Sequence, residues 1–488
     1  MTNPPDEQQK LLAEKMKAEA NALFQGRHYQ QALDAYDKAI ELSPDNCVLY
    51  SNRALTNYKL ENYGSALADA SKCLELDRTF IKGFYRRGTS YMALGKYKDA
   101  LKDFTAVTKI VPTDPDALAK LKECKKVYDQ MRFAAAISSS DSNKPKTSKR
   151  VTEELVNLVV EESYDGPRLD EGGNVSFDFV KELISYYKAQ KKLHRRYMYQ
   201  ILLKVIAVFA SLPNIVDISL SPGKRLMTVC GDTHGQFYDL CNIFEINGYP
   251  SRENPYVFNG DMVDRGSFST EVIMTMLAFK AMDPDSIHLT RGNHETRNMN
   301  KMYGFEGEMK AKYPGETMFE LFMEAFCWLP LGMLLEKKVL VVHGGLFSKD
   351  GITIEDIQKV DRNREPPDEG IMSEILWSDP QKANGWGPSK RGVGVAFGPD
   401  VTKRFLASNN LNLLVRSHEC KDQGYEVEAD GKLITIFSAP NYCDQMGNRG
   451  AFIRFGKDLR PDFKQFDAVP HPMVKPMAYS PLSSMMGM

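Results

Sequence analysis

The sequence has no long apolar run and almost no net charge, and its few cysteines form no pattern. The longest apolar stretch, 201–212, is interrupted by Lys204 and falls well short of the ~20 residues that a membrane-spanning helix needs. With 63 basic and 64 acidic residues the formal net charge is -1, which gives no support for binding to nucleic acid or to a membrane surface. The eight cysteines include no CxxC pair, which argues against a disulfide framework and for a reducing compartment.

The polar first residues, MTNPPDEQQK, lack the apolar core of a signal peptide. We therefore expect a cytoplasmic and also nuclear protein. The basic run KPKTSKR favours nuclear import, although short basic runs are common in linkers. A chain of 488 residues has room for two or three domains.

A period of 34 residues runs through the first quarter of the chain. The positions that match are Tyr29, Tyr63 and Tyr97, then Ala32, Ala66 and Ala100, then Ala20, Ala54 and Gly88. Asp69 and Asp103 form a further match, from which Ala35 departs. Small residues at a fixed period are typical of helix pairs that cross closely, with an aromatic side chain filling the space beside them. The alternative is a helical bundle whose spacing is accidental.

This pattern resembles the tetratricopeptide-repeat (TPR) family. The resemblance implies an all-α TPR solenoid over residues 13–133. Its three helix-pair repeats would cover about 13–46, 47–80 and 81–114, and the amphipathic segment after them would form a capping helix. Residues 134–163, which begin with a Ser- and Lys-rich stretch, are predicted to be a linker.

Five residues on the first helices of the predicted repeats offer cationic or amide donors, and none of the five is a carboxylate. These positions are Lys17, Asn21, Asn52, Lys82 and Arg86. They resemble the two-carboxylate clamp of TPR domains that bind chaperones ending in EEVD. The implied partner is the ninety-kilodalton heat-shock chaperone, and a seventy-kilodalton relative is the second candidate. Any one of these cations, taken alone, is more simply read as a solvated surface residue.

The second domain, predicted over 164–470, repeats one arrangement. An apolar β-prone run ends, and a loop rich in Gly, Asp and His follows at once. The loops are GDTHG (231–235), GDMVDRG (260–266), RGNHE (291–295), HGG (343–345), RSHE (416–419) and SAPNYC (438–443). Loops at the carboxyl ends of strands are where α/β folds place their sites.

These loops offer three oxygen ligands and three imidazoles. The residues are Asp232, His234, Asp261, Asn293, His343 and His418. A mixed nitrogen and oxygen set suits Mn, Fe or Zn. Six ligands are too many for one ion that must keep an open position, and they suit two ions bridged by one carboxylate.

The loops GDxHG, GDxVDRG and GNHE, in this order and spacing, resemble the PPP family of metallophosphatases. The resemblance implies an α/β metallophosphoesterase domain with a central β-sandwich flanked by helices, acting on phosphoserine and phosphothreonine in proteins. It implies two divalent metal ions, with manganese the expected metal in vitro. Asp232, His234 and Asp261 would hold the first ion. Asp261, Asn293, His343 and His418 would hold the second.

The resemblance also implies a mechanism in which a metal-bound hydroxide attacks phosphorus directly, with no phosphoenzyme. His294 is the expected acid for the leaving alkoxide, and Asp264 is expected to orient it. Arg265 and Arg391 are the expected guanidinium forks for the phosphate, together with Asn293. Tyr442 is expected to flank the cleft, either binding substrate or packing.

Two other functions fit parts of this pattern. One is a phosphodiesterase or nucleotidase of the wider metallophosphoesterase superfamily, and the other is a co-chaperone adaptor with an inactive phosphatase domain. We also expect that the TPR domain covers the catalytic cleft at rest. The Met-rich tail, 471–488, is read either as a weak latch or as an unstructured end.

Overall fold

The computed structural model describes residues 7–138, 146–220 and 226–480. Its contacts divide the chain into two compact units. The first comprises residues 1–144 and 388–393, and the second comprises residues 145–387 and 394–488.

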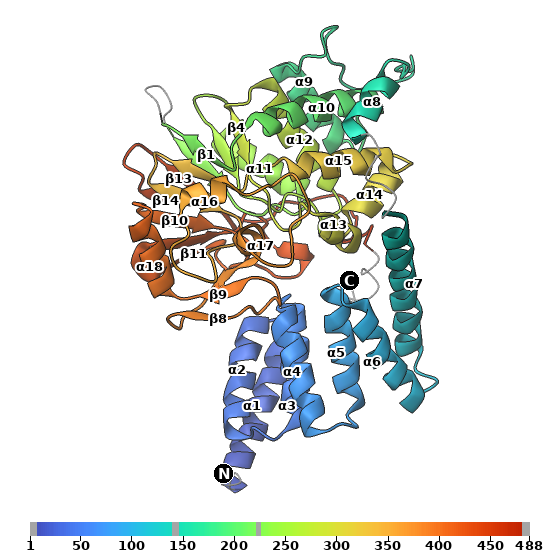
Figure 1. Cartoon of the computed structure of the whole chain (residues 1–488), viewed down its shortest axis with the longest axis vertical. Coiled ribbons are helices and arrows are strands. Elements are labelled where there is room, and N and C mark those ends of the chain that lie inside the picture. The colour runs from blue at the N-terminus through green and yellow to red at the C-terminus, as the bar shows by residue number, and fades with distance from the viewer. Residues whose placement is uncertain (1–6, 139–145, 221–225, 481–488) are drawn as a thin grey trace. The chain divides into compact units, whose positions relative to one another are not determined.

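The first unit is built from seven helices within the described part of residues 1–144. They are α1 (Glu7–Gln25), α2 (Tyr29–Leu42), α3 (Cys47–Lys59), α4 (Tyr63–Leu76), α5 (Ile81–Ala93), α6 (Tyr97–Ile110) and α7 (Pro115–Ser138). The predicted all-α TPR architecture is therefore confirmed, with three helix pairs followed by a longer last helix (Figure 1).

The 34-residue period corresponds to close helix contacts. Ala32, Ala66 and Ala100 are fully buried at equivalent places on the second helices. At Gly88 an added Cβ would lie 3.1 Å from the ring of Phe104, closer than ordinary contact. The small residues are thus needed because the paired helices approach too closely for larger side chains.

The partial match at Asp69 and Asp103 has a separate cause. Arg53 of α3 donates two hydrogen bonds to Asp69 of α4, at 3.0 and 2.6 Å. One repeat later, Arg87 donates to Asp103 in the same way, at 2.9 and 2.7 Å. A repeated bidentate pair joins the two helices of the second and third repeats. The first repeat has Glu19 and Ala35 at these positions and so lacks the pair.

Part of the predicted linker, 134–163, is ordered secondary structure in the second unit. Helix α8 (Thr147–Leu155) begins beside Glu324, which accepts hydrogen bonds from the backbone N–H and the hydroxyl of Ser148 at 2.9 and 2.6 Å. Val151 of the same helix is fully buried in the core.

The second unit contains two large sheets. The first sheet has the order β1-β5-β6-β10-β12-β11 and the second has the order β14-β13-β2-β3-β4. Their strands are β1 (Ile215–Ile218), β2 (Met227–Cys230), β3 (Tyr256–Phe258), β4 (Ile287–Leu289), β5 (Gly332–Leu335), β6 (Val339–Val342), β10 (Leu413–Arg416), β11 (Tyr425–Glu428), β12 (Leu433–Ile436), β13 (Gly450–Phe455) and β14 (Pro461–Phe466). A small sheet joins β7 (Asp379–Pro380), β9 (Val395–Phe397) and β8 (Trp386–Pro388).

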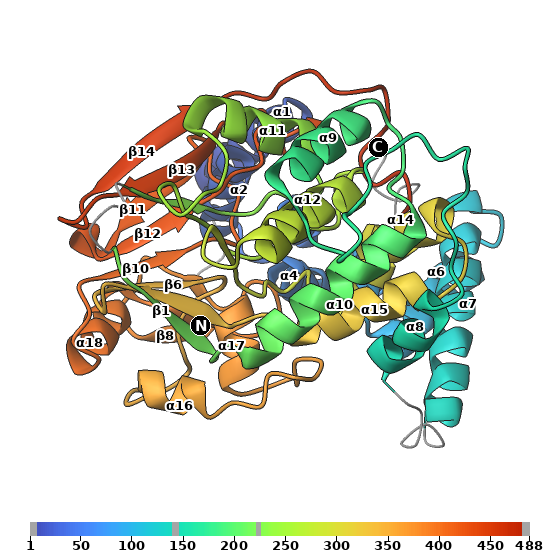
Figure 2. The same ribbon diagram turned by 90° about the horizontal axis from the view of Figure 1, so that it is seen from above.

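Helices cover the outer faces of both large sheets. They are α9 (Phe177–Lys188), α10 (Arg195–Ser211), α11 (Phe237–Asn247), α12 (Ser269–Met282), α13 (Arg297–Tyr303), α14 (Phe305–Lys312), α15 (Thr317–Cys327), α16 (Ile354–Gln358), α17 (Ile371–Trp377) and α18 (Pro399–Ser408). Figure 2 shows α9 to α12 and α15 on the side of one sheet, and α16 and α18 on the side of the other.

Apolar residues of both sheets, such as Val229 and Val341, form one shared core between them. Separate cores join each sheet to its helices. The expected β-sandwich flanked by helices is therefore confirmed. Strands β2, β3 and β4 are parallel, and so are β6, β10 and β12. Because parallel strands end at the same edge, their loops gather in one place. Within the described ranges, the helices are too short or too polar to cross a membrane.

Candidate active site

Five strand ends supply the predicted metal ligands, and the structure brings all of them together. Asp232 and His234 follow β2, Asp261 follows β3, Asn293 follows β4, His343 follows β6 and His418 follows β10. All six side chains are buried. A chain of short contacts joins them, beginning with the backbone N–H of His418, which lies 3.2 Å from Asp232 Oδ1.

His343 presents a lone pair to three other potential ligand atoms. Its Nδ1 lies 2.8 Å from the carbonyl oxygen of Asn259, and a carbonyl only accepts, so Nδ1 carries the proton. Its Nε2 is therefore unprotonated. That atom lies 3.3 Å from Asp261 Oδ2, 2.8 Å from the side-chain oxygen of Asn293 and 3.1 Å from His418 Nδ1.

His234 repeats this arrangement on the other side of Asp261. Its Nδ1 lies 3.0 Å from the carbonyl oxygen of Val263, so its Nε2 also presents a lone pair. This Nε2 lies 3.5 Å from Asp261 Oδ2 and 3.7 Å from Asp232 Oδ2. Burial lowers the pKa of His234 well below its ordinary value, with the neighbouring charges of His294 and Arg265 contributing. A neutral imidazole is the form that binds a metal.

These lone pairs repel one another unless a cation lies between them. Two groups of side chains have ligand atoms within 4.8 Å of one another. One is His234, Asp261 and His294, and the other is Asp261, His343 and His418. Asp261 belongs to both groups. The donor set therefore fits two cations that share the Asp261 carboxylate, with nitrogen and oxygen ligands on each side.

Two glycines let the loops approach this closely. An added Cβ at Gly292 would lie 2.2 Å from Asp261 Oδ1, and Gly260 has φ of +79°. The loops also hold non-glycine residues in the left-handed region: φ is 40° at His234, 49° at Asp261 and 70° at His418. Residues held in such conformations cluster at functional sites.

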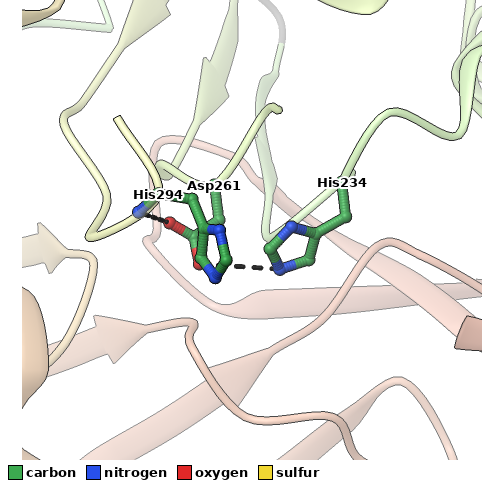
Figure 3. A group of neighbouring side chains, drawn as sticks. All are labelled: His234, Asp261 and His294. Carbon is green, nitrogen blue, oxygen red and sulfur yellow. Dashed lines mark hydrogen bonds and ion pairs between the residues drawn. The ribbon is translucent and has the colours of Figure 1, made fainter. Parts of the chain in front are cut away.

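His294 forms a pair with Asp264 beside the ligands. His294 Nδ1 lies 2.8 Å from Asp264 Oδ2, and the His294 backbone N–H donates to Asp261 Oδ1 at 2.8 Å. Asp264 also accepts hydrogen bonds from the Asn300 side chain and from the Phe305 backbone, each at 2.9 Å. Burial raises the pKa of Asp264 to about 7, against these hydrogen bonds. Figure 3 shows the His294 ring between the Asp261 carboxylate and the His234 ring, and the centroids of the two rings lie 4.8 Å apart.

Two of the predicted substrate-binding residues also lie here. The Arg265 guanidinium stacks on the Tyr303 ring at 3.8 Å from its centroid, which holds it by cation–π attraction. The Tyr442 ring lies 5.2 Å from the ring of His234. Arg391, by contrast, lies in the segment 388–393 that groups with the first unit, and its role stays a prediction.

In the first unit, the predicted clamp residues lie on helices α1, α3 and α5. Asn21 and Asn52 meet across two helices, because the Asn52 amide donates to the Asn21 side-chain oxygen at 3.2 Å. The Tyr36 hydroxyl donates to the same oxygen at 2.6 Å. Lys17 pairs with Glu14 on its own helix, and Lys82 is exposed on α5.

Comparison with known proteins decides the family. The calcineurin-like phosphoesterase family matches residues 226–422, the PPP5 TPR repeat region matches residues 121–217, and a TPR repeat matches residues 20–61. The chain is 53% identical to serine/threonine-protein phosphatase 5 of Homo sapiens over 486 residues, covering 99% of this chain and 96% of that one. The chain belongs to the serine/threonine-protein phosphatase 5 family.

Other relatives agree with this assignment. Serine/threonine-protein phosphatase 5 of Arabidopsis thaliana is 54% identical over 521 residues, covering 96% of each chain. A solved protein serine/threonine phosphatase from Saccharomyces cerevisiae, with similarity to human phosphatase PP5, matches with a TM-score of 0.60 and 42% identity, covering 62% of this chain and 100% of that one. The chain is thus a protein serine/threonine phosphatase with TPR repeats, and its metallophosphoesterase domain implies a dinuclear metal centre.

Glu295 also belongs to this phosphatase site, although the sequence predicted no role for it. Glu295 is fully buried and accepts hydrogen bonds from the backbone N–H groups of Asp261, Met262 and Gly292, each at 2.8 Å. It therefore fixes the loop that presents Asp261. Glu295 ends the RGNHE motif, but the motif does not show which backbone groups this carboxylate binds.

The C-terminal segment contributes to the phosphatase site in a way that no motif announced. The backbone N–H of Met477 donates to the Arg265 carbonyl at 2.7 Å, and the Ser267 hydroxyl donates to the Lys475 carbonyl at 2.6 Å. Arg265 Nη1 lies 3.9 Å from the Met477 sulfur. Residues 475–480 thus pack along the loop that carries Arg265. Residues 481–488 of the predicted tail lie outside the described ranges.

Proposed function

We propose that this phosphatase hydrolyses phosphoserine and phosphothreonine by direct displacement at two divalent metal ions. Asp232, His234 and Asp261 would hold one ion. Asp261, Asn293, His343 and His418 would hold the other. The observation that carries the proposal is the convergence of unprotonated His234 and His343 Nε2 atoms on one shared carboxylate. When bound, the ions would neutralise phosphoryl charge and lower the pKa of a bound water. The metals are proposed as Mn, Fe or Zn, with manganese expected in vitro.

The chain's own residues supply binding and proton transfer. His294 would hold a proton at Nε2 for the departing serine or threonine oxygen, because Asp264 fixes its Nδ1. Arg265, held by Tyr303, would bind the phosphate through its guanidinium, and Arg391 and Asn293 are proposed to assist. Tyr442 would form the apolar side of the cleft next to His234.

The test is steady-state hydrolysis of a phosphothreonine peptide after removal and return of metal. Chelated protein should be inactive and should recover with Mn²⁺. His294→Asn should lower kcat roughly 10²- to 10⁴-fold while bound metal, measured by elemental analysis, stays at two ions. An inactive wild-type chain with its metal in place would instead support the adaptor reading.

A diesterase of the wider superfamily is the alternative on the same ligands. Bis-p-nitrophenyl phosphate, assayed beside the phosphopeptide, discriminates the two functions. A higher kcat/KM for the diester would overturn the phosphomonoesterase proposal.

We further propose that the TPR unit binds the C-terminal EEVD peptide of the ninety-kilodalton heat-shock chaperone. Lys17, Asn21, Asn52, Lys82 and Arg86 would contact the peptide carboxylates. Support comes from the first helices, where the Asn21 and Asn52 amides meet. Binding of the seventy-kilodalton relative's peptide with equal affinity would widen the partner class.

We also infer that the TPR unit restrains the phosphatase at rest and that peptide binding relieves this restraint. One chain holds the two units together, so their effective concentration is high. Cytoplasmic and nuclear localisation stays a prediction.

A further inference from the structure

The capping helix α7 carries a lysine in the same register as two of the predicted clamp residues. Asn52 on α3, Arg86 on α5 and Lys120 on α7 are each 34 residues apart. Because the repeat period places such residues at equivalent points on successive first helices, Lys120 continues the line that Asn52 and Arg86 begin.

Most of the Lys120 side chain is buried, and it forms no ion pair with the described residues. Only 9% of it is exposed, and its ammonium lies 5.9 Å from the centroid of the Tyr85 ring. The Arg86 guanidinium lies 5.9 Å from the same ring. In the described part of the chain, Lys120 has no hydrogen bond or ion pair, and Arg86 Nε is buried without a hydrogen-bond partner.

Burial lowers the pKa of Lys120, and the charge of Arg86 adds to this effect. Asp116 and Glu123, on the same helix as Lys120, act in the opposite direction. Neither forms an ion pair with Lys120 within the residues described. Burial likewise lowers the pKa of Lys59 on α3, and Arg27 and Arg86 add to this effect.

A buried cation without a partner costs free energy that an arriving anion can recover. Arg86 and Lys120 thus lie beside one aromatic ring, and Lys59 is close enough to Arg86 for its pKa to respond to that charge. Cations gathered in this way suit a carboxylate. The position of Lys120 on the first-helix face, beyond Arg86, is where an extended peptide held by the clamp would continue.

We infer that Lys120 and Arg86 form an additional subsite, which binds one acidic side chain of the docked peptide upstream of its terminal carboxylate. The inference rests on the proposed docking function and deepens it. Lys120 thereby favours partners whose C-terminal peptides carry an acidic side chain upstream of the last residue, in addition to the terminal carboxylate.

The test uses the full chain and a fluorescein-labelled peptide ending in EEVD, followed by anisotropy. Lys120→Met keeps the apolar stem over Tyr85 and removes the charge. It should weaken binding roughly 10-fold, as expected for loss of a charge-assisted hydrogen bond. Lys125→Met is the matched control, because Lys125 is exposed on the same helix. It should change the affinity less than about twofold, as for an exposed charge.

Thermal unfolding separates a binding role from a structural one. Because Lys120 is a buried charge with no ion pair, Lys120→Met should leave the melting temperature of the TPR unit unchanged or raise it. Weaker binding accompanied by a lower melting temperature would mean that Lys120 only supports packing, which would overturn the inference.

A double-mutant cycle locates the partner side chain. Each glutamate of the peptide is replaced in turn by glutamine, and each peptide is measured against wild type and Lys120→Met. One glutamate should lose most of its contribution in the Lys120→Met chain. If no glutamate couples to Lys120, the subsite is wrong.

A third variant distinguishes failure of the subsite from failure of the clamp. If Lys120→Met binds like wild type while Arg86→Ala loses the peptide, the clamp stands and the Lys120 subsite is refuted. If both variants bind like wild type, the proposed docking function fails as well.

Discussion

His294 can act on a substrate proton or bind a metal, and its surroundings decide between the two. Its ring lies in a group of potential ligands with His234 and Asp261. Yet its Nδ1 faces a buried carboxylate that already accepts two other hydrogen bonds. A carboxylate in that position stabilises the imidazolium, which is the form that donates a proton. We therefore assign His294 to proton transfer.

The Asp264→Asn substitution tests this pairing. An amide cannot stabilise the imidazolium, so kcat should fall roughly 10²-fold with little change in KM or in bound metal. If Asp264 acts only through His294, the double variant with His294→Asn should be no slower than His294→Asn alone. Additive losses in the phosphopeptide assay would contradict the pairing. Asp285→Asn, on the surface, is the control.

Residue roles were predictable from sequence where a motif carried them. The six proposed ligands and the proposed acid His294 all fall in short loops of Asp, His, Asn and Gly, and the sequence alone suggests metal chemistry for such loops. Glu295 differs, because its role depends on three backbone N–H groups that lie 33 or 34 residues upstream or in its own loop. Backbone donors leave no signature in a sequence.

At the scale of elements, the structure gives the C-terminal segment a role that the sequence did not predict. The sequence reading offered a latch or an unstructured end for 471–488. In the structure the Met477 backbone N–H donates to the Arg265 carbonyl. The Ser267 hydroxyl donates to the Lys475 carbonyl and accepts from the Ala478 backbone N–H. This segment therefore supports the proposed phosphate-binding residue.

Shortening the chain tests this support. In a chain that begins at residue 145, ending after Val474 should lower kcat/KM for the phosphopeptide roughly 10- to 100-fold, because Arg265 loses its fixed position. Ending after Ser480 keeps these contacts and should leave kcat/KM within about twofold, which is small on the same scale. Equal activity of the two truncations would show that the segment does not position Arg265.

Helix α12 holds a buried lysine whose charge should make stability depend on pH. The Lys280 ammonium is buried and donates to the carbonyls of Pro284 and Ile287 at 2.7 and 2.9 Å. Burial lowers the pKa of Lys280 to about 8. Below pH 8 Lys280 is charged in both the folded and the unfolded chain, so folding bears the full free-energy cost of burying the charge. Between pH 8 and 10.5 the unfolded chain binds more protons, so stability rises with pH.

The Lys280→Met variant should lack this rise. The lowered pKa of Lys280 corresponds to about 3 kcal/mol. The variant's advantage over wild type, measured by denaturant unfolding of the phosphatase unit, should therefore shrink by up to that amount from pH 7 to pH 10.5. A difference in stability that does not vary with pH would mean that Lys280 keeps its ordinary pKa in the fold.

At the scale of the whole molecule, the proposed restraint of the phosphatase by the TPR unit has a clear test. Removing residues 1–144 should raise basal phosphopeptide hydrolysis severalfold and abolish any further stimulation by the EEVD peptide. Unchanged basal activity would refute the restraint. The cut belongs before α8, since Val151 is part of the phosphatase core. A chain starting after Leu155 should unfold at a lower temperature.

The sequence by itself determined the two domain types and the order of the loops that carry the candidate metal ligands. These follow from a 34-residue period and from loops placed at strand ends, both of which are local patterns. Only the tertiary structure decided what holds those residues in place. Three features depend on groups that are distant along the chain. They are the lone pairs that converge on Asp261, the backbone contacts of Glu295 and of residues 475–478, and the burial of Lys120 beside Tyr85. Burial and proximity of that kind are properties of the packed molecule, because no local pattern encodes which distant segment fills a given space.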